Sequence, residues 1–184
     1  MQPLRPDATL ADVQEYVEKM EIERGLAGLS LGSQCLKLAE EIGELAAASG
    51  EDDEVPGECV DVLILLASIL NRAGIDLERT VADRFPGTGR VTLADLPARM
   101  AGSDLVGLDV AGLCVRAAIE TGELCRAVRK LNGAPSDPGG RTVVLAETCA
   151  DLVLLLGAFA HLLSFDLAEA FRAKEEINNS RVWT

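Results

Sequence analysis

The sequence contains an internal repeat, and this repeat constrains the fold more than any other feature. The segment 41–45 (EIGEL) returns at 120–124 (ETGEL), ECVDVLILL from Glu58 returns as TCADLVLLL from Thr148, and GIDLERTVADRF from Gly74 returns as SFDLAEAFRAKE from Ser164. The three segments keep the same order and roughly the same spacing. A duplicated unit of this kind predicts two helical hairpins packed about a pseudo-two-fold axis, a covalent version of a symmetric dimer.

Helical periodicity dominates the chain, and no segment shows the alternation of a β-strand. The pattern predicts seven helices, at about 10–24, 33–48, 57–72, 77–84, 108–131, 142–163 and 167–180, with Thr9 or Asp7 capping the first. Proline and glycine between residues 86 and 107 predict a linker with one short helical turn near Leu96. The expected fold is therefore an all-α bundle. Residues 1–85 form the first repeat, 86–107 the linker and 108–184 the second repeat, and both repeats pack as one globular unit.

The composition narrows the classes of partner. Seventeen basic and 30 acidic residues give a net charge of -13, which disfavours nucleic acid and anionic lipid as ligands. The five cysteines form no CxxC pair, and an odd number of them without a secretory signal predicts reduced, buried thiols. The longest apolar runs are shorter than the ~18 residues of a membrane span. We therefore expect a cytoplasmic protein with no membrane segment.

Four carboxylates of the first half are candidates for a metal site. Glu41 and Glu44 share one face of a predicted helix, and Glu58 and Asp61 share a face of the next. A short loop joins the two helices, so the four carboxylates should converge, and Glu40 lies beside them. Hard oxygen ligands suit Mg²⁺, with Mn²⁺ as the alternative ion. Asp61 precedes five apolar residues, and a carboxylate in such a buried helix is costly unless it is paired or metal-bound.

Other interpretations of these residues stay open, whereas other site chemistries fit poorly. Glu40, Glu41 and Glu44 could instead be ordinary solvated helix residues. A ferritin-like di-iron centre needs Glu-x-x-His ligands, but the single histidine, His161, has Ala158 three residues before it. The sequence also has no zinc-ligand spacing and no phosphate-binding glycine loop.

At these residues the chain resembles the MazG-like all-α nucleoside triphosphate pyrophosphohydrolases. The family's EExxE motif stands here as Glu40-Glu41-Ile42-Gly43-Glu44, and its ExxD motif as Glu58-Cys59-Val60-Asp61. A further family pattern, K-x-x-x-N-x-x-R on the last helix, stands as Lys174, Asn178 and Arg181, followed by Trp183. The resemblance covers most of the chain, although the segment 86–107 has no counterpart.

The two halves depart from this family pattern in complementary ways. In the second half Ile119 replaces Glu40 and Thr148 replaces Glu58, while Glu120, Glu123 and Asp151 remain, with Glu147 one position out of register. In the first half Arg84 matches Lys174, but no asparagine and arginine follow it. The resemblance therefore implies a fused dimer with one complete site, built from acids of the first half and the basic helix of the second.

The resemblance also implies an activity: hydrolysis of nucleoside triphosphates between the α- and β-phosphates, giving a nucleoside monophosphate and pyrophosphate. Glu41, Glu44, Glu58 and Asp61 would bind Mg²⁺, and Glu40 or Glu41 would orient or deprotonate the attacking water. The implied substrate-binding residues are Lys37, Lys174, Asn178 and Arg181. Each has a simpler alternative role: Lys37 as the charge partner of Glu41, Lys174 and Arg181 as cations near a helix C-terminus, and Asn178 as part of a fraying helix end. Tyr16 and Trp183 are candidates to stack on a base or simply to pack.

Two other functions remain open at this stage. The first is a non-catalytic nucleotide-binding or regulatory protein, or a helical interaction module, because a degenerate second site is typical of relaxed constraint after duplication. The second is a related enzyme that acts on another pyrophosphate, such as phosphoribosyl-ATP. The sequence allows either a monomeric pseudo-dimer or a homodimer, and it leaves the choice of base undetermined.

Overall fold

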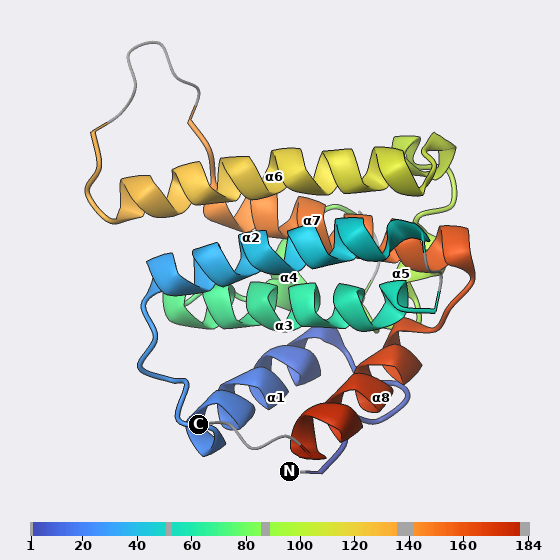
Figure 1. The fold of residues 1–184 in the computed structure, drawn as a ribbon, viewed down its shortest axis with the longest axis horizontal. Coiled ribbons are helices and arrows are strands. Elements are labelled where there is room, and N and C mark those ends of the chain that lie inside the picture. The colour runs from blue at the N-terminus through green and yellow to red at the C-terminus, as the bar shows by residue number, and fades with distance from the viewer. Residues whose placement is uncertain (1, 51–52, 86–88, 136–141, 181–184) are drawn as a thin grey trace.

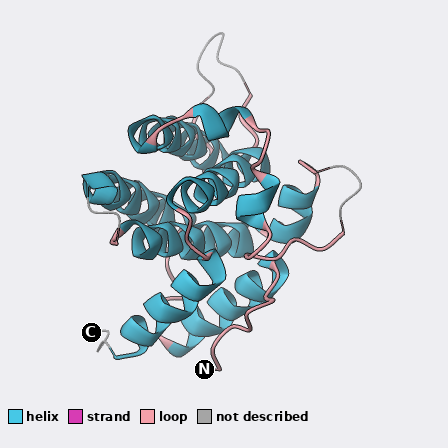
Figure 2. Cartoon of the chain, turned by 90° about the vertical axis from the view of Figure 1, so that its right-hand side faces the viewer, coloured by secondary structure: helices cyan, strands magenta, loops and turns pink. Residues whose placement is uncertain are grey.

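The chain folds into packed α-helices (Figures 1 and 2). The computed structural model describes residues 2–50, 53–85, 89–135 and 142–180. The described helices are α1 (Leu10–Glu23), α2 (Leu31–Ala47), α3 (Val55–Ala73), α4 (Leu77–Ala82), α5 (Leu96–Arg99), α6 (Val110–Leu131), α7 (Leu145–Leu163) and α8 (Leu167–Ser180), with short 3-10 turns at Ala48–Gly50 and Asp104–Gly107. Over these residues the all-α prediction is confirmed, and the only extended pairing is a single bridge between Thr9 and Thr92.

Two helical hairpins form the centre of the protein. Helices α2 and α3 make the first hairpin, α6 and α7 make the second, and they meet through contacts of α2 with α6 and of α3 with α7. Helices α1 and α8 cover the outer side of α3 (Figure 1), while α4 and α5 pack against α7. The core therefore lies along α3 and α7, whose fully buried side chains include Leu63, Leu66, Ile69 and Phe159.

Local chemistry sets most of the helix boundaries. Thr9 and Asp12 form a capping box at the start of α1, which confirms the predicted cap. Ser30 accepts a hydrogen bond from the Ser33 amide and starts α2 at Leu31, two residues earlier than predicted. Gly74 ends α3 with φ 66°, a left-handed conformation that glycine adopts without strain.

The segment predicted as a linker contributes to the core. Of its described part, residues 89–107, the side chains of Val91, Leu93, Leu96 and Met100 are buried, and α5 packs on α7. The carbonyl oxygen of Val91 also accepts a hydrogen bond from the amide of Leu10, the first residue of α1, and the Leu93 amide donates to the carbonyl oxygen of Ala8. The glycines and prolines correctly predict an irregular path, but the apolar residues between them are buried.

Helix α7 is the only described helix long and apolar enough to cross a membrane by length and composition. However, 67% of its most apolar window is buried inside the protein, as expected for a central core helix. The five cysteines are free thiols; Cys35, Cys59 and Cys149 are buried as predicted, whereas Cys114 and Cys125 are only partly buried.

Candidate functional site

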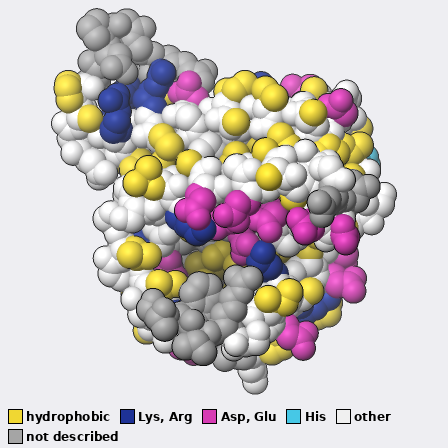
Figure 3. All heavy atoms as spheres, viewed as in Figure 1, with side chains coloured by type: hydrophobic (Ala, Val, Ile, Leu, Met, Phe, Trp, Pro, Cys, Tyr) yellow, Lys and Arg dark blue, Asp and Glu magenta, His cyan; other side chains and the backbone are white. Residues whose placement is uncertain are grey.

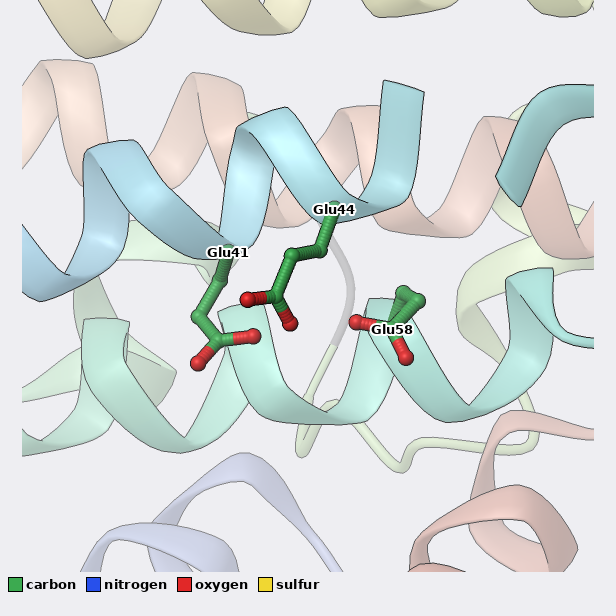
Figure 4. A group of neighbouring side chains, drawn as sticks. All are labelled: Glu41, Glu44 and Glu58. Atoms are coloured by element: carbon green, nitrogen blue, oxygen red, sulfur yellow. The ribbon is translucent and has the colours of Figure 1, made fainter. Parts of the chain in front are cut away.

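Three carboxylates converge between α2 and α3. Glu41 and Glu44 lie three residues apart on one face of α2, and Glu58 lies in the first turn of α3 facing them (Figure 4). One oxygen atom from each residue lies within 4.8 Å of the others, a spacing at which all three could bind one cation. The short connection between the helices produces this convergence, because it folds α3 back antiparallel to α2.

Two of the three carboxylates, Glu41 and Glu58, are withdrawn from solvent, whereas Glu44 is exposed. Glu41 is only 5% exposed, and within the described residues the Oε2 atoms of Glu41 and Glu58 are buried without a hydrogen-bond partner. Burial raises the pKa of the Glu41 and Glu58 carboxyls, and the neighbouring charges of Asp61 and Glu44 raise it further. Lys37 lowers the pKa of Glu41, and Lys174 lowers that of Glu58, but neither cancels the rise. Buried carboxylate oxygens without donors are the atoms that a divalent cation would satisfy, so the residues fit an Mg²⁺ or Mn²⁺ ion.

Asp61 lies beside this group and is paired with the last helix. The Nζ atom of Lys174, on α8, lies 2.5 Å from Asp61 Oδ2 and 3.6 Å from Glu58 Oε1. Helix α8 packs on α3, which brings Lys174 to the acids from the far end of the sequence. These contacts place a cation of the second half beside carboxylates of the first half.

Lys37 is held by two of the predicted site residues. Its Nζ lies 2.8 Å from Glu40 Oε1 and 2.5 Å from Glu41 Oε1, along the same helix. Burial disfavours its charge, but the hydrogen bonds to the two glutamates outweigh burial, so the pKa of Lys37 is raised. Glu40 has a largely exposed side chain and lies outside the three-carboxylate group, at the solvent edge of the site.

The remaining predicted residues have different environments. Asn178 is buried on α8 and donates to Glu175 Oε1 at 3.0 Å. Tyr16 is also buried, packs edge-on against Phe171 and donates to Glu175 Oε2, so it has the packing role that the sequence left open. Arg181 and Trp183 lie outside the described residues.

A cavity of about 430 Å³ adjoins the acids. Its wall joins Lys37, Glu41 and Asp61 to apolar side chains of α1, α3 and the loop before α2, chiefly Met20, Leu26, Leu29, Ile64 and Leu65. Figure 3 shows a band of acidic side chains across this face, with apolar side chains in the hollow beneath it. The site therefore offers a polar rim beside a mostly apolar pocket, an arrangement typical of small-molecule binding.

A buried polar network at this cavity was missed by the sequence analysis. Glu21 of α1 accepts hydrogen bonds from Gln34 Nε2 (3.0 Å), Ser68 Oγ (2.6 Å) and Arg72 (2.8 Å). One signal was available: Glu21 continues the four-residue spacing of Val13 and Val17 on the buried face of α1. Its partners come from α2 and α3, which spacing along α1 does not reveal.

The acids of the second half are arranged differently. Asp151 pairs with Arg84 (2.9 Å), and Glu120 lies 3.4 Å from Arg116. Within the part of the chain that the structure describes, the second half brings together no three-carboxylate group comparable to that of Glu41, Glu44 and Glu58. The described residues therefore hold a single candidate metal centre, in the first half.

The chain has a distant, partial similarity to one curated hydrolase. It is 40% identical over 77 residues to a dATP/dGTP diphosphohydrolase of Salmonella phage PMBT28. The match covers 42% of this chain and 25% of that protein, so the chain spans about a quarter of its relative's length. No protein-family model matches the chain, and no solved structure matches it significantly.

Proposed function

We propose that this protein is a Mg²⁺-dependent nucleoside triphosphate pyrophosphohydrolase that cleaves between the α- and β-phosphates. The observation that carries the proposal is the convergence of Glu41, Glu44 and Glu58 with two buried oxygens that lack donors, flanked by Lys37 and Lys174. The name of the phage relative adds support, because it describes hydrolysis of nucleotides. That name also favours purine deoxynucleoside triphosphates as substrates. Mn²⁺ is the alternative to Mg²⁺ at the carboxylates.

The residues of this site have separate tasks in such a reaction. The bound cation would offset phosphate charge and lower the pKa of water. Lys37 and Lys174 flank the acids and would stabilise charge that develops on the phosphates. Glu40, at the open edge, or Glu41 would take a proton from the attacking water. As the water oxygen bonds to phosphorus, the bond to the bridging oxygen breaks and releases pyrophosphate or the nucleoside monophosphate, according to the phosphorus attacked. Arg181 would add a further phosphate contact, and Asn178 a contact to phosphate or sugar.

We further propose that the chain is a fused pseudo-dimer with one catalytic site. Helix α8 follows α7 and packs on α3, while α4 follows α3 and packs on α7, so each hairpin receives the helix that follows the other. The ion pair of Lys174 with Asp61 has a counterpart in that of Arg84 with Asp151, at matched positions of the repeat. The helices α3 and α7 both end in a left-handed residue, Gly74 and Ser164. These matches support a duplication in which the second acidic set has lost its metal.

The test is pyrophosphate release from a panel of canonical and modified nucleoside triphosphates, with and without Mg²⁺. Release of pyrophosphate that requires Mg²⁺ and is lost in Glu44→Gln is the expected result, and the exposed Glu18→Gln on α1 is the control. Release of orthophosphate instead would place the cleaved bond elsewhere. Binding of nucleotides without any turnover would favour a regulatory role, and absence of both by a folded protein would overturn the proposal.

A further inference from the structure

The wall of the cavity beside the acids contains one amide whose orientation is chemically determined. Gln34 is 4% exposed, lines the cavity, and directs its Nε2 at Glu21 Oε1 at 3.0 Å. An ionised carboxylate only accepts hydrogen bonds, so the donor side of the amide must face Glu21. The carbonyl oxygen, Oε1, is therefore held on the opposite side of the amide group.

The partner of Gln34 is itself fixed in place. Ser68 donates to Glu21 Oε1 at 2.6 Å, and Arg72 donates to Glu21 Oε2 at 2.8 Å. Arg72 also donates to the carbonyl oxygens of Leu26 and Leu29, whose side chains line the same cavity. The network thus holds the loop before α2 and the Gln34 amide in one arrangement.

The Oε1 atom of Gln34 is the acceptor that this wall presents to an occupant. Within the described residues it accepts no hydrogen bond, although the side chain around it is almost fully buried. An amide oxygen that has no donor at the cavity wall can accept a hydrogen bond from a ligand N–H. The neighbouring side chains of Met20, Leu29 and Leu65 are apolar and suit the faces of a flat ring.

The position of Gln34 along α2 relates it to the acids. Gln34, Lys37 and Glu41 follow one another at spacings of three and four residues, so they share one face of the helix. Seven residues of helix separate Gln34 from Glu41 by about 10 Å along the axis. A nucleotide with its phosphates at the carboxylates would extend its base toward Gln34.

We propose that Gln34, positioned by Glu21, is a specificity-determining residue that selects nucleotides whose base carries an exocyclic amino group. The inference rests on the proposed function, because it assumes that the acids bind the phosphates. Adenine and cytosine present an amino group where hypoxanthine and uracil present a keto oxygen, and guanine has an amino group that hypoxanthine lacks. The Gln34 oxygen attracts an amino group and repels a keto oxygen. Nucleotides that carry hypoxanthine or uracil should therefore bind more weakly than those that carry adenine, guanine or cytosine.

The experiment compares three substrate pairs, dATP with dITP, dGTP with dITP, and dCTP with dUTP. For each nucleotide, kcat/KM is measured with Mg²⁺ and the dissociation constant is measured with Ca²⁺ by calorimetry. We expect the natural chain to prefer the amino-bearing member of at least one pair by roughly 10- to 100-fold, since a site that hydrogen-bonds an amino group rejects the analogue that cannot donate. In Gln34→Met the preference should fall to within about twofold, since Met retains the volume and loses the oxygen.

Two further variants separate recognition from folding. Glu21→Gln lets position 21 donate as well as accept, so the Gln34 amide can turn over, and the preference should weaken while the cavity keeps its shape. Leu36→Met, at a site on α2 that is 75% exposed, should leave the preference unchanged. Each variant is first shown to melt cooperatively.

The outcomes distinguish this inference from the proposed function. Turnover with equal efficiency within every pair would overturn the role of Gln34 and leave the pyrophosphohydrolase intact. If the natural chain shows a binding preference that Gln34→Met abolishes, but hydrolyses no nucleotide, the role of Gln34 is supported and the proposed enzymatic activity is rejected. A preference that persists in Gln34→Met would overturn the inference, because another group must then read the base.

Discussion

The Nζ atom of Lys174 lies 2.5 Å from the Oδ2 atom of Asp61, and this contact joins the last helix to the acidic hairpin. Both side chains are mostly buried, 12% and 21% exposed respectively. A buried ion pair of this kind is weak evidence for stability, because desolvation offsets the attraction between the charges. In the proposed function, Lys174 binds phosphate charge beside Glu41, Glu44 and Glu58.

Replacement of this lysine tests that role. We expect Lys174→Met to lower kcat/KM by about 10²-fold, because one preorganised cation near the phosphates is lost. Lys174→Arg should retain part of the activity, and Lys19→Met on the exposed face of α1 should retain all of it. Steady-state pyrophosphate release measures the effect, and unchanged turnover in Lys174→Met would show that the last helix does not contribute to the site.

Metal binding can be measured without turnover. Mg²⁺ or Mn²⁺ should raise the melting temperature of the natural chain, since a ligand at 100 times its dissociation constant stabilises the native state by about 2.7 kcal/mol. Glu44 is exposed, so Glu44→Gln should fold normally and lose most of this shift. Thermal scans over a metal titration provide the measurement, and equal shifts in both proteins would place the ion elsewhere.

The second acidic set should be dispensable for catalysis. Asp151 matches Asp61 in the repeat but pairs with Arg84, and no three-carboxylate group forms around it within the described residues. We expect Asp151→Asn to keep activity within about twofold, whereas Asp61→Asn should reduce it by at least about 10²-fold. The pair forms a matched comparison under one assay. Comparable losses in both variants would indicate a second working site.

The segment 89–107, between α4 and α6, should contribute measurably to stability. Leu96 is fully buried where α5 packs on α7. We expect Leu96→Ala to lower the free energy of unfolding by about 2–4 kcal/mol, because the removed methyl groups leave a cavity. Leu36→Ala, on the exposed face of α2, should change it by less than about 0.5 kcal/mol. Urea denaturation followed by circular dichroism compares the two. A negligible effect of Leu96→Ala would mean that the segment is a spacer.

The thiol of Cys35 should resist alkylation in the native protein. Burial, and then the contact with Cys125 at 3.1 Å between the sulfur atoms, raise the pKa of Cys35 to about 12. Because the thiolate is the reactive form and its pKa is raised, the fraction of thiolate at pH 8 is lower than in the unfolded chain. Iodoacetamide labelling followed by peptide mass spectrometry should therefore modify Cys35 far faster in urea. Equal rates in both states would contradict the burial.

Much of the fold could be predicted from periodicity and caps. Thr9, Gly74 and the spacing of leucines in α3 and α7 act over a few residues, so a linear pattern reveals them. The buried residues at positions 91, 93, 96 and 100 were missed because their spacing follows neither a helical nor a strand period, and because their partners lie on α7 and at the start of α1.

The candidate site, like the fold, could be predicted from the sequence only in part. The spacing along two apolar helices joined by a short loop predicted four converging carboxylates. Glu41, Glu44 and Glu58 form the compact group, whereas Asp61 lies beside it and pairs with Lys174. The packing of α8 on α3 brings Lys174 to Asp61, and the packing of α1 against α3 brings Glu21 to Ser68 and Arg72. These contacts join residues that are far apart in the chain. The burial of apolar helix faces decides which helices pack together, and no local sequence pattern encodes that choice.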